Sequence, residues 1–236
     1  MASLYLLITL LLLVHLNIFF AAPVRDFPKI LLLITSNGQS YHQKMLLYCW
    51  PKIIHLDIFK HADALIYYAT NHNITNHKAI YERMFKNNVT FIFDRNHGYQ
   101  KGAVVPMKRG LNEGWFLGYD WIVRINPDVI INNDTFLISN MHDSRVHGIF
   151  TDCFSRCKNK VSCGLVHTDF IAFRPRYAGP VFEGTFSTAE RYATSQFMPV
   201  IQSGHAVWLP YTTQQGICRV TGKMSFVVHA HSCPIL

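Results

Sequence analysis

The sequence has no run of basic residues and little charge of either sign. Charged residues make up 15% of the 236-residue chain, with 22 Lys and Arg scattered along it against 14 Asp and Glu. A nucleic-acid-binding protein usually gathers its basic residues into a stripe or patch, so this pattern argues against nucleic acid as a partner. The formal charge of +8 favours an anionic ligand such as a phosphorylated small molecule, although a merely solvated basic surface would account for it equally well.

Internal repeats, low-complexity tracts and a convincing interdomain linker are also missing from the sequence. Repeat architectures and multidomain arrays are thereby excluded. Half of the residues are hydrophobic, which is enough to bury a substantial core. We therefore predict a single domain over residues 27–236.

The N-terminus carries no charge over residues 3–22, a stretch long enough to span a bilayer. A cleaved signal peptide is the alternative, because residues 4–14 have the length of a signal core and small residues follow. Pro23 lies just beyond these small residues and no basic residue precedes the core, which argues against cleavage. We predict a signal-anchor or signal peptide over residues 1–22. The protein would then be single-pass and membrane-anchored, or lumenal, in the Golgi or ER, or secreted if the segment is cleaved.

The six cysteines form an even set without a close C-x-x-C pair. Three of them fall within "CFSRCKNKVSC", which keeps a zinc site open as an alternative. In a chain with a targeting segment, disulfides are the default expectation. Three Asn-x-Thr sequons are weak further support for a lumenal glycoprotein (Asn73, Asn88 and Asn133).

Apolar runs alternate with helical patterns through the first half of the chain. The runs predict strands, and the patterns between them predict helices. Pro51 ends the first of these helices. The third has Pro106 in an early turn and Gly114 or Gly118 near its end. The expected strands are residues 27–36, 62–70, 88–94 and 119–126, and the expected helices are 40–53, the middle of 71–87, and 100–118. This order indicates an α/β layer whose largely parallel strands are covered on both faces.

The second half predicts further strands and one helical stretch. The expected strands are residues 147–153, 164–175 and 206–210, and the helical stretch is 187–204. The whole pattern predicts an α/β domain, with the first half binding a nucleotide-like group and the second half completing the site.

The stretch "DWIVRINPDVIIN" interrupts a buried strand with Asn126, Pro127 and Asp128. Proline cannot donate a hydrogen bond within a sheet, and a buried unpaired carboxylate is costly. Asn-Pro-Asp is ordinary turn chemistry, which is the simpler interpretation. However, ligands of open parallel sheets bind beyond the carboxyl ends of the strands, where an acid suits a divalent cation. Asp128 is therefore a candidate metal ligand.

Two histidines near the C-terminus are candidates for the same site. In "SFVVHAHSC", strand alternation puts His229 and His231 on one side. Mn²⁺ accepts imidazole as well as carboxylate ligands, so one of them could share a cation with Asp128. They could equally be exposed terminal histidines in a chain that has 13.

With these residues in place, the chain resembles the GT-A-fold glycosyltransferases. "GYDWIVRINPDVIINNDTFL" is similar to their metal-binding DXD strand, and "NHGYQKGAVVPMKRGL" to the loop and helix under the sugar nucleotide. "HTDFIAFRP" and "STAERYAT" resemble the acceptor-side strand and acidic helix start, and "VVHAHSC" the C-terminal histidine of the metal shell. The pattern covers roughly residues 29–233, and it resembles a small, poorly described group of such enzymes in single-celled eukaryotes and their viruses more than any well-studied family.

The resemblance implies a GT-A-like, Rossmann-type mixed sheet flanked by helices. It also implies transfer of a sugar from a nucleotide-diphosphate sugar to an acceptor hydroxyl of a glycan or glycoprotein, with Mn²⁺ or Mg²⁺ as the cofactor. Asp128, His229 and His231 would be the metal ligands, and Glu190 and Asp169 the candidate catalytic carboxylates. If the enzyme is retaining, neither carboxylate need act as a base. The residues expected to bind the nucleotide sugar are Thr35, Ser36, Asn37, Asp94, Asn96, Lys101, Arg124 and Asn126.

One departure from the family pattern concerns Asn126, which stands where the first DXD acid would be. If the amide merely occupies that position, Asn126→Asp is expected to tighten metal binding. The missing charge also keeps open a secreted or membrane-tethered carbohydrate-binding protein that is a catalytically inactive relic. A metal-dependent hydrolase is the third alternative, but the sequence shows no second cluster of His and Asp ligands.

Overall fold

The computed structural model describes residues 27–70, 75–85, 88–152, 165–213 and 227–229. In the described ranges, no helix has the length and apolar character needed to cross a membrane. The apolar segment at residues 3–22 lies outside these ranges, as do all the cysteines except Cys49. The N-terminal targeting segment and the disulfides therefore stay predictions.

The described strands form one mixed sheet in the order β3-β2-β1-β4-β7-β6-β8-β9-β5. β1, β2, β3 and β4 are mutually parallel, as the sequence predicted for the first half. β7 runs antiparallel to both β4 and β6, and β8 extends past β6 to pair with β9. The strands are β1 (Ile30–Ser36), β2 (Asp63–Ala69), β3 (Val89–Asp94), β4 (Trp121–Ile125), β5 (Val129–Ile131), β6 (Gly148–Asp152), β7 (Phe170–Phe173), β8 (Ala206–Thr213) and β9 (Val227–His229).

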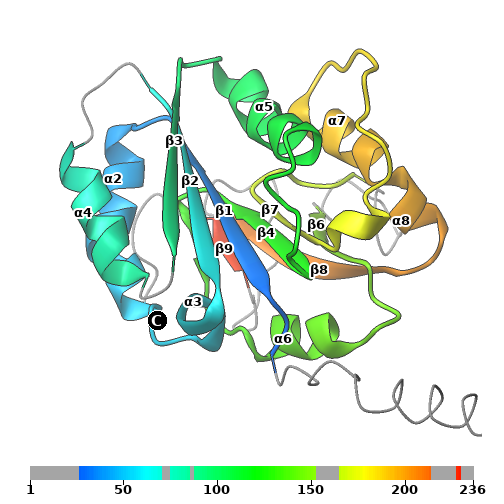
Figure 1. Cartoon of the computed structure of the whole chain (residues 1–236), viewed down its shortest axis with the longest axis horizontal. Coiled ribbons are helices and arrows are strands. Elements are labelled where there is room, and N and C mark those ends of the chain that lie inside the picture. Colours follow the sequence, from blue (N-terminus) through cyan, green and yellow to red (C-terminus); the bar gives the residue numbers. More distant parts are fainter. Residues whose placement is uncertain (1–26, 71–74, 86–87, 153–164, 214–226, 230–236) are drawn as a thin grey trace, which may run out of the picture.

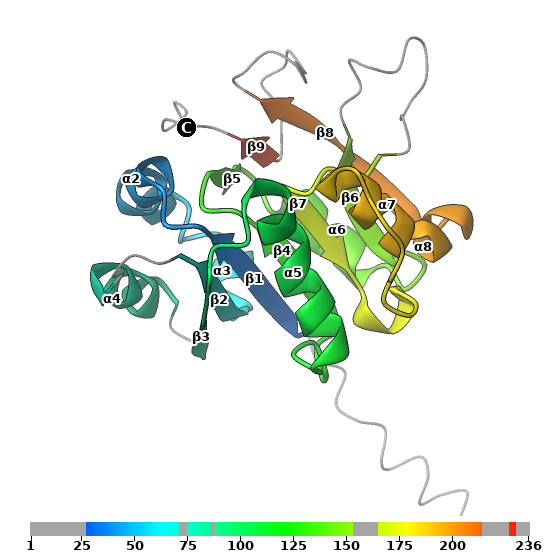
Figure 2. The same ribbon diagram turned by 90° about the horizontal axis from the view of Figure 1, so that it is seen from above.

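Helices cover both faces of this sheet (Figures 1 and 2). One group lies against one face: α2 (Ser40–Tyr48), α3 (Asp57–His61), α4 (Thr75–Met84) and α6 (Thr135–His142), with the 3₁₀ turn η1 (Trp50–Lys52). The other face carries α5 (Tyr99–Asn112), α7 (Ala189–Gln196) and α8 (Met198–Gln202), and the 3₁₀ turn η3 (Pro175–Tyr177) precedes α7. The mixed α/β fold with flanking helices is thus confirmed.

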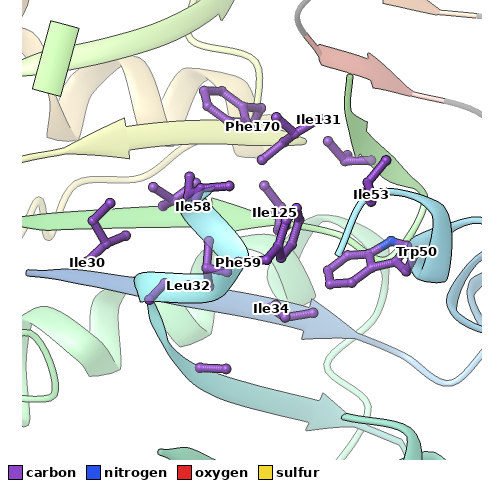
Figure 3. Close-up of a cluster of buried hydrophobic side chains, with 14 of the residues drawn as sticks. Ile30, Leu32, Ile34, Trp50, Ile53, Ile58, Phe59, Ile125, Ile131 and Phe170 are labelled. Atoms are coloured by element: carbon purple, nitrogen blue, oxygen red, sulfur yellow. The ribbon is translucent and has the colours of Figure 1, made fainter. Parts of the chain in front are cut away.

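The uniformly apolar strands follow from this three-layer arrangement, because every residue of a central strand faces a helical layer. Along β1, Ile30, Leu32 and Ile34 join one core cluster, which also contains Trp50 and Phe59 (Figure 3). The intervening residues of β1, Leu31 and Leu33, join the cluster on the opposite face.

The helix predicted over residues 100–118 is shorter, and its proline lies deeper, than expected. α5 ends at Asn112, because Gly114 adopts a φ of 75° and the Trp115 N–H closes back onto the Gly110 carbonyl at 3.1 Å. Pro106 lies in the middle of this helix, rather than in an early turn. Likewise, the helical stretch predicted over residues 187–204 is two helices, and α8 has Pro199 in its first turn.

Candidate functional site

The strand register brings three polar segments to one edge of the sheet. Ile34 of β1 pairs with Ile125 of β4, and Ile125 pairs in turn with Phe170 of β7. Because β7 runs in the opposite direction, the residue before its start, Asp169, lies level with Asn126, which follows the end of β4. Thr35 of β1 lies beside both, so residues far apart in the chain meet at this edge.

Asn126 is the centre of a hydrogen-bond network at this edge. Its side-chain oxygen accepts from the Thr35 hydroxyl and from the Arg124 guanidinium, each at 2.8 Å. Its side-chain nitrogen donates to the Asp169 carboxylate at 3.1 Å. Arg124 also donates to Thr35 Oγ1 at 2.8 Å, and its guanidinium is only 1% exposed. The amide therefore links a buried cation on one side to a carboxylate on the other.

Asn126, Pro127 and Asp128 form a turn that leads out of β4 and into β5. The Val129 N–H donates to the Asn126 carbonyl at 3.0 Å, and the Trp50 indole N–H donates to the Pro127 carbonyl at 2.7 Å. β5 then pairs with β9 rather than continuing along β1. The interruption seen in the sequence is thus where the chain passes from one part of the sheet to another. The turn leaves the Asp128 carboxylate buried, at 3% exposure, but at the wall of a cavity.

His42 of α2 lies next to Asp128, and the sequence interpretation missed it. Its Nε2 is 3.5 Å from Asp128 Oδ2, and its Nδ1 is 3.3 Å from the Ser36 hydroxyl oxygen. His42 precedes the buried residues Met45 and Leu46 of the same helix by three and four positions. This helical spacing was the available signal, since it puts the imidazole on the buried face of α2.

The predicted histidine ligands are only partly within the described structure. β9 ends at His229, whose backbone pairs with Val129, the residue after Asp128. This register brings the C-terminal strand next to the Asn126–Asp128 turn. His231 lies outside the described residues.

Thr168, Asp169 and Glu190 line one wall of the same cavity, and the last two are the carboxylates that the sequence singled out. The Glu190 carboxylate accepts a hydrogen bond from the Thr168 hydroxyl at 3.2 Å, while the second oxygen of Asp169 lies 3.3 Å from His167 Nδ1. Glu190 lies in the first turn of α7, where a carboxylate also interacts favourably with the helix dipole. This wall is tied to the opposite one, because the Ala189 N–H donates to the side-chain oxygen of Gln100 at the start of α5.

Asp94 at the end of β3 fixes a tyrosine in the floor of the cavity. The Tyr67 hydroxyl donates to Asp94, and the guanidinium of Arg109 and the imidazole of His97 each lie 3.1 Å from the same carboxylate oxygen. The hydrogen bond from Tyr67, followed by that from His97, holds the pKa of Asp94 well below its usual range. Burial, followed by the bond to Asp94, raises the pKa of Tyr67. Asp94 is thus an ionised anchor for a neutral tyrosine.

These groups surround a cavity of about 290 Å³. Of the residues predicted to bind the nucleotide sugar, two do not line this cavity: Lys101 is exposed on α5, and Asp94 stands behind Tyr67. The predicted residues that line it are Thr35, Ser36, Asn37, Asn96, Arg124, Asn126, Asp128, Asp169 and Glu190. The lining residues that the sequence interpretation missed are Tyr41, His42, Tyr67, Ala69, Gly98, Gln100, Gly102, Ala103, Thr168 and Ala189.

Several of the missed residues belong to α5, whose N-terminus opens onto the cavity. Gly98 precedes the helix with a φ of 84°, a conformation that favours glycine, and no side chain caps the first turn. A helix N-terminus carries a partial positive charge and unpaired N–H groups, which suit an anionic ligand.

The donor set near Asp128 fits a divalent cation that arrives together with a diphosphate. Asp128 offers carboxylate oxygen and His42 offers imidazole nitrogen, both acceptable to Mn²⁺. Within the part of the chain that the structure describes, no group of three His, Cys, Asp or Glu side chains is arranged to hold a metal alone. Oxygens of the diphosphate would have to complete the shell, as is usual for Mg²⁺ sites with phosphate substrates.

No protein-family model matches the chain, and a search of curated proteins finds no match either. Solved structures do match. Mouse xyloside xylosyltransferase 1 in its apo form aligns with a TM-score of 0.51 and 8% identity, over 86% of this chain and 97% of that one. The mannosyltransferase PcManGT from Pyrobaculum calidifontis, solved with GDP-Man and Mn²⁺, aligns with a TM-score of 0.51 and 10% identity, over 86% of this chain and 59% of that one.

A third match is the bifunctional glycosyltransferase WbbM, with a TM-score of 0.54 and 11% identity over 88% of this chain. This chain spans less than half of WbbM, at 46% of its length. At such low identities the likeness establishes the fold alone. The fold is GT-A-like, that of nucleotide-sugar glycosyltransferases, as the sequence predicted. The narrower likeness to enzymes of single-celled eukaryotes and their viruses stays a prediction.

Proposed function

We propose that the protein is a glycosyltransferase that moves a sugar from a nucleotide-diphosphate sugar to an acceptor hydroxyl. The observation that carries the proposal is the meeting of Asn126, Asp128, Asp169 and Glu190 around one cavity at the carboxyl edge of a GT-A-like sheet. Cavities at this edge are the usual ligand sites of open α/β sheets. The uncapped start of α5 provides a place for the diphosphate, and the net charge of +8 favours an anionic donor.

Asp128 would hold Mn²⁺ or Mg²⁺ at the diphosphate, with His229 or His231 as the second protein ligand implied by the family resemblance. When bound, the cation acts as a Lewis acid that stabilises the negative charge of the departing nucleotide. Thr35, Ser36, Asn37 and Asn96 line the part of the cavity assigned to the base and ribose. Arg124 adds positive charge beneath Asn126, where the network with Thr35 holds it in place.

The two acceptor-side carboxylates would have different roles. Asp169 has one oxygen on the Asn126 amide and the other near His167, so it is suited to orient the acceptor sugar. For Glu190, Thr168 is the one side-chain donor found among the described residues. In an inverting reaction Glu190 would accept the proton of the acceptor hydroxyl as the new bond forms.

The acceptor is proposed to be a glycan or glycoprotein, and the setting to be lumenal or membrane-anchored in the Golgi or ER. The uncharged segment at residues 3–22 and the sequons support this setting. An inactive carbohydrate-binding relic is the alternative, and it rests on the absence of a carboxylate at position 126. The hydrogen bonds of Asn126 give the amide a structural role of its own, which weakens the case for this alternative.

A screen of nucleotide sugars for binding and for hydrolysis, with and without Mn²⁺, tests the proposal. We expect at least one UDP- or GDP-sugar to be turned over slowly in the presence of Mn²⁺. Asp128→Ala should remove metal-dependent nucleotide binding. Asp57→Ala, which changes an exposed aspartate paired with Lys60 on α3, is the matched control and should behave as wild type. Sugar binding without any affinity for nucleotides would favour the carbohydrate-binding relic instead.

A further inference from the structure

His42 and Asp128 stand at a separation close to that of two ligands of one cation. Their Nε2 and Oδ2 atoms are 3.5 Å apart, whereas an N–H···O bond usually spans about 2.7–3.2 Å. Two ligand atoms that each bind a cation at about 2.1 Å lie about 3.0–3.4 Å apart for octahedral or tetrahedral angles. Both side chains are almost fully buried except where they meet the cavity, at 7% exposure for His42 and 4% for Asp128.

Ser36 sets the imidazole in the orientation that ligation requires. Its hydroxyl oxygen accepts the Gly38 N–H at 3.1 Å and lies 3.3 Å from His42 Nδ1. A hydroxyl oxygen has two lone pairs, so it can also accept a proton from Nδ1. In the tautomer that carries its proton on Nδ1, the Ser36 hydroxyl accepts that proton, and the lone pair of Nε2 is on the side of Asp128. Metal-binding histidines commonly have such a partner on their second nitrogen.

Asn126 is not placed to supply the ligand that the first acid of a DXD motif would give. Its side-chain oxygen already accepts hydrogen bonds from Thr35 and Arg124, and its nitrogen donates to Asp169. A cation at that oxygen would compete with the buried guanidinium, which carries the same sign of charge. A second protein ligand would therefore come from another element.

We propose that His42, on the helix that follows β1, binds the divalent cation together with Asp128. The inference rests on the proposed function, because the cation is expected to arrive with a nucleoside diphosphate. It implies that His42 of α2 supplies the metal ligand that the first acid of a DXD motif would otherwise supply. An imidazole in place of a carboxylate lowers the net negative charge of the site and favours Mn²⁺ over Mg²⁺, since Mg²⁺ prefers oxygen ligands.

Electron spin-echo spectroscopy of bound Mn²⁺ tests this directly, because a coordinated imidazole nitrogen gives a coupling that oxygen ligands do not. The full chain would be loaded with Mn²⁺ and either UDP or GDP, and free Mn²⁺ would be measured in parallel to obtain affinity. We expect a nitrogen coupling in the wild type. In His42→Gln the coupling should weaken or vanish, and affinity should fall by at least the ~10- to 100-fold that loss of an outer partner of a metal ligand typically costs. Ser36→Ala, which leaves both ligands in place, should lower affinity by less.

His142→Gln is the matched control, since His142 is exposed on α6, away from the cavity. Absence of nitrogen coupling in the wild-type complex would overturn the inference without reliance on any variant. An unchanged coupling in a folded His42→Gln protein would also overturn it, and would assign the nitrogen to another histidine. In either case Asp128→Ala should still lose Mn²⁺-dependent binding if the proposed function holds. If wild type binds neither nucleotide with Mn²⁺, the proposed function fails along with the inference.

Discussion

Replacing Asn126 with aspartate would restore the usual acidic motif, yet the structure predicts a poorer site. The variant loses the N–H that donates to Asp169 at 3.1 Å and presents a carboxylate to a carboxylate. At an effective dielectric of about 20, two like charges at that distance repel by about 5 kcal/mol. The new carboxylate also gains an attraction to Arg124 at 2.8 Å, which at the same dielectric is about 6 kcal/mol.

These two charge effects nearly cancel, so the lost hydrogen bond decides the outcome. A hydrogen bond to a charged group contributes about 1.5–3 kcal/mol, and we expect the free energy of unfolding to fall by about that amount. Asp169 would also turn away from Asn126, which should weaken acceptor use. Metal affinity should not rise, contrary to the expectation from sequence that the amide merely occupies an acidic position.

Urea unfolding and Mn²⁺ titration of Asn126→Asp measure both effects. Asn133→Asp is the matched control, because the Asn133 side-chain oxygen accepts from the Thr135 N–H and a carboxylate can do the same. The control should retain wild-type stability and metal binding. An Asn126→Asp protein that is as stable as wild type and binds Mn²⁺ more tightly would refute the reasoning.

Three further predictions concern other parts of the molecule. Glu190→Gln should lower turnover by at least ~100-fold with little change in nucleotide affinity, because the amide cannot accept the proton of the acceptor hydroxyl. Glu183→Gln is the control. Unchanged turnover in Glu190→Gln would show that Glu190 is not the proton acceptor. Trp50→Phe should lower the free energy of unfolding in urea by about 1–3 kcal/mol, because the Pro127 carbonyl loses its buried donor. It should also loosen the turn that holds Asp128. A free energy of unfolding equal to that of wild type within error would show that water replaces the indole N–H. Burial, then repulsion from His205, lowers the pKa of His147, so wild-type stability should fall as the pH drops below the unfolded value of about 6.5. His147→Phe should flatten this pH dependence while keeping a ring to stack on Tyr177, and a steeper decline would contradict the assignment.

Much of the fold could be predicted from local sequence. Continuous apolar runs predicted β1, β2 and β4, because strands covered on both faces need no polar alternation, and a similar run predicted β3 at the edge of the sheet. The polar residues after these runs predicted part of the cavity wall, since the carboxyl ends of parallel strands meet at one edge. Asp128 was identified in this way from the interruption of an apolar run.

The pairing of β7 and the placement of His42 depended on tertiary structure. Asp169 faces Asn126 only because β7 runs antiparallel to β4, and no local pattern specifies the direction or register of a distant strand. His42 meets Asp128 because α2 packs beside the turn that Trp50 fixes, and the two residues are far apart in sequence. The sequence by itself determined which residue types end each strand. Only the folded chain decided which of them share a hydrogen bond or can share a cation, because those contacts depend on packing between segments with no local relation.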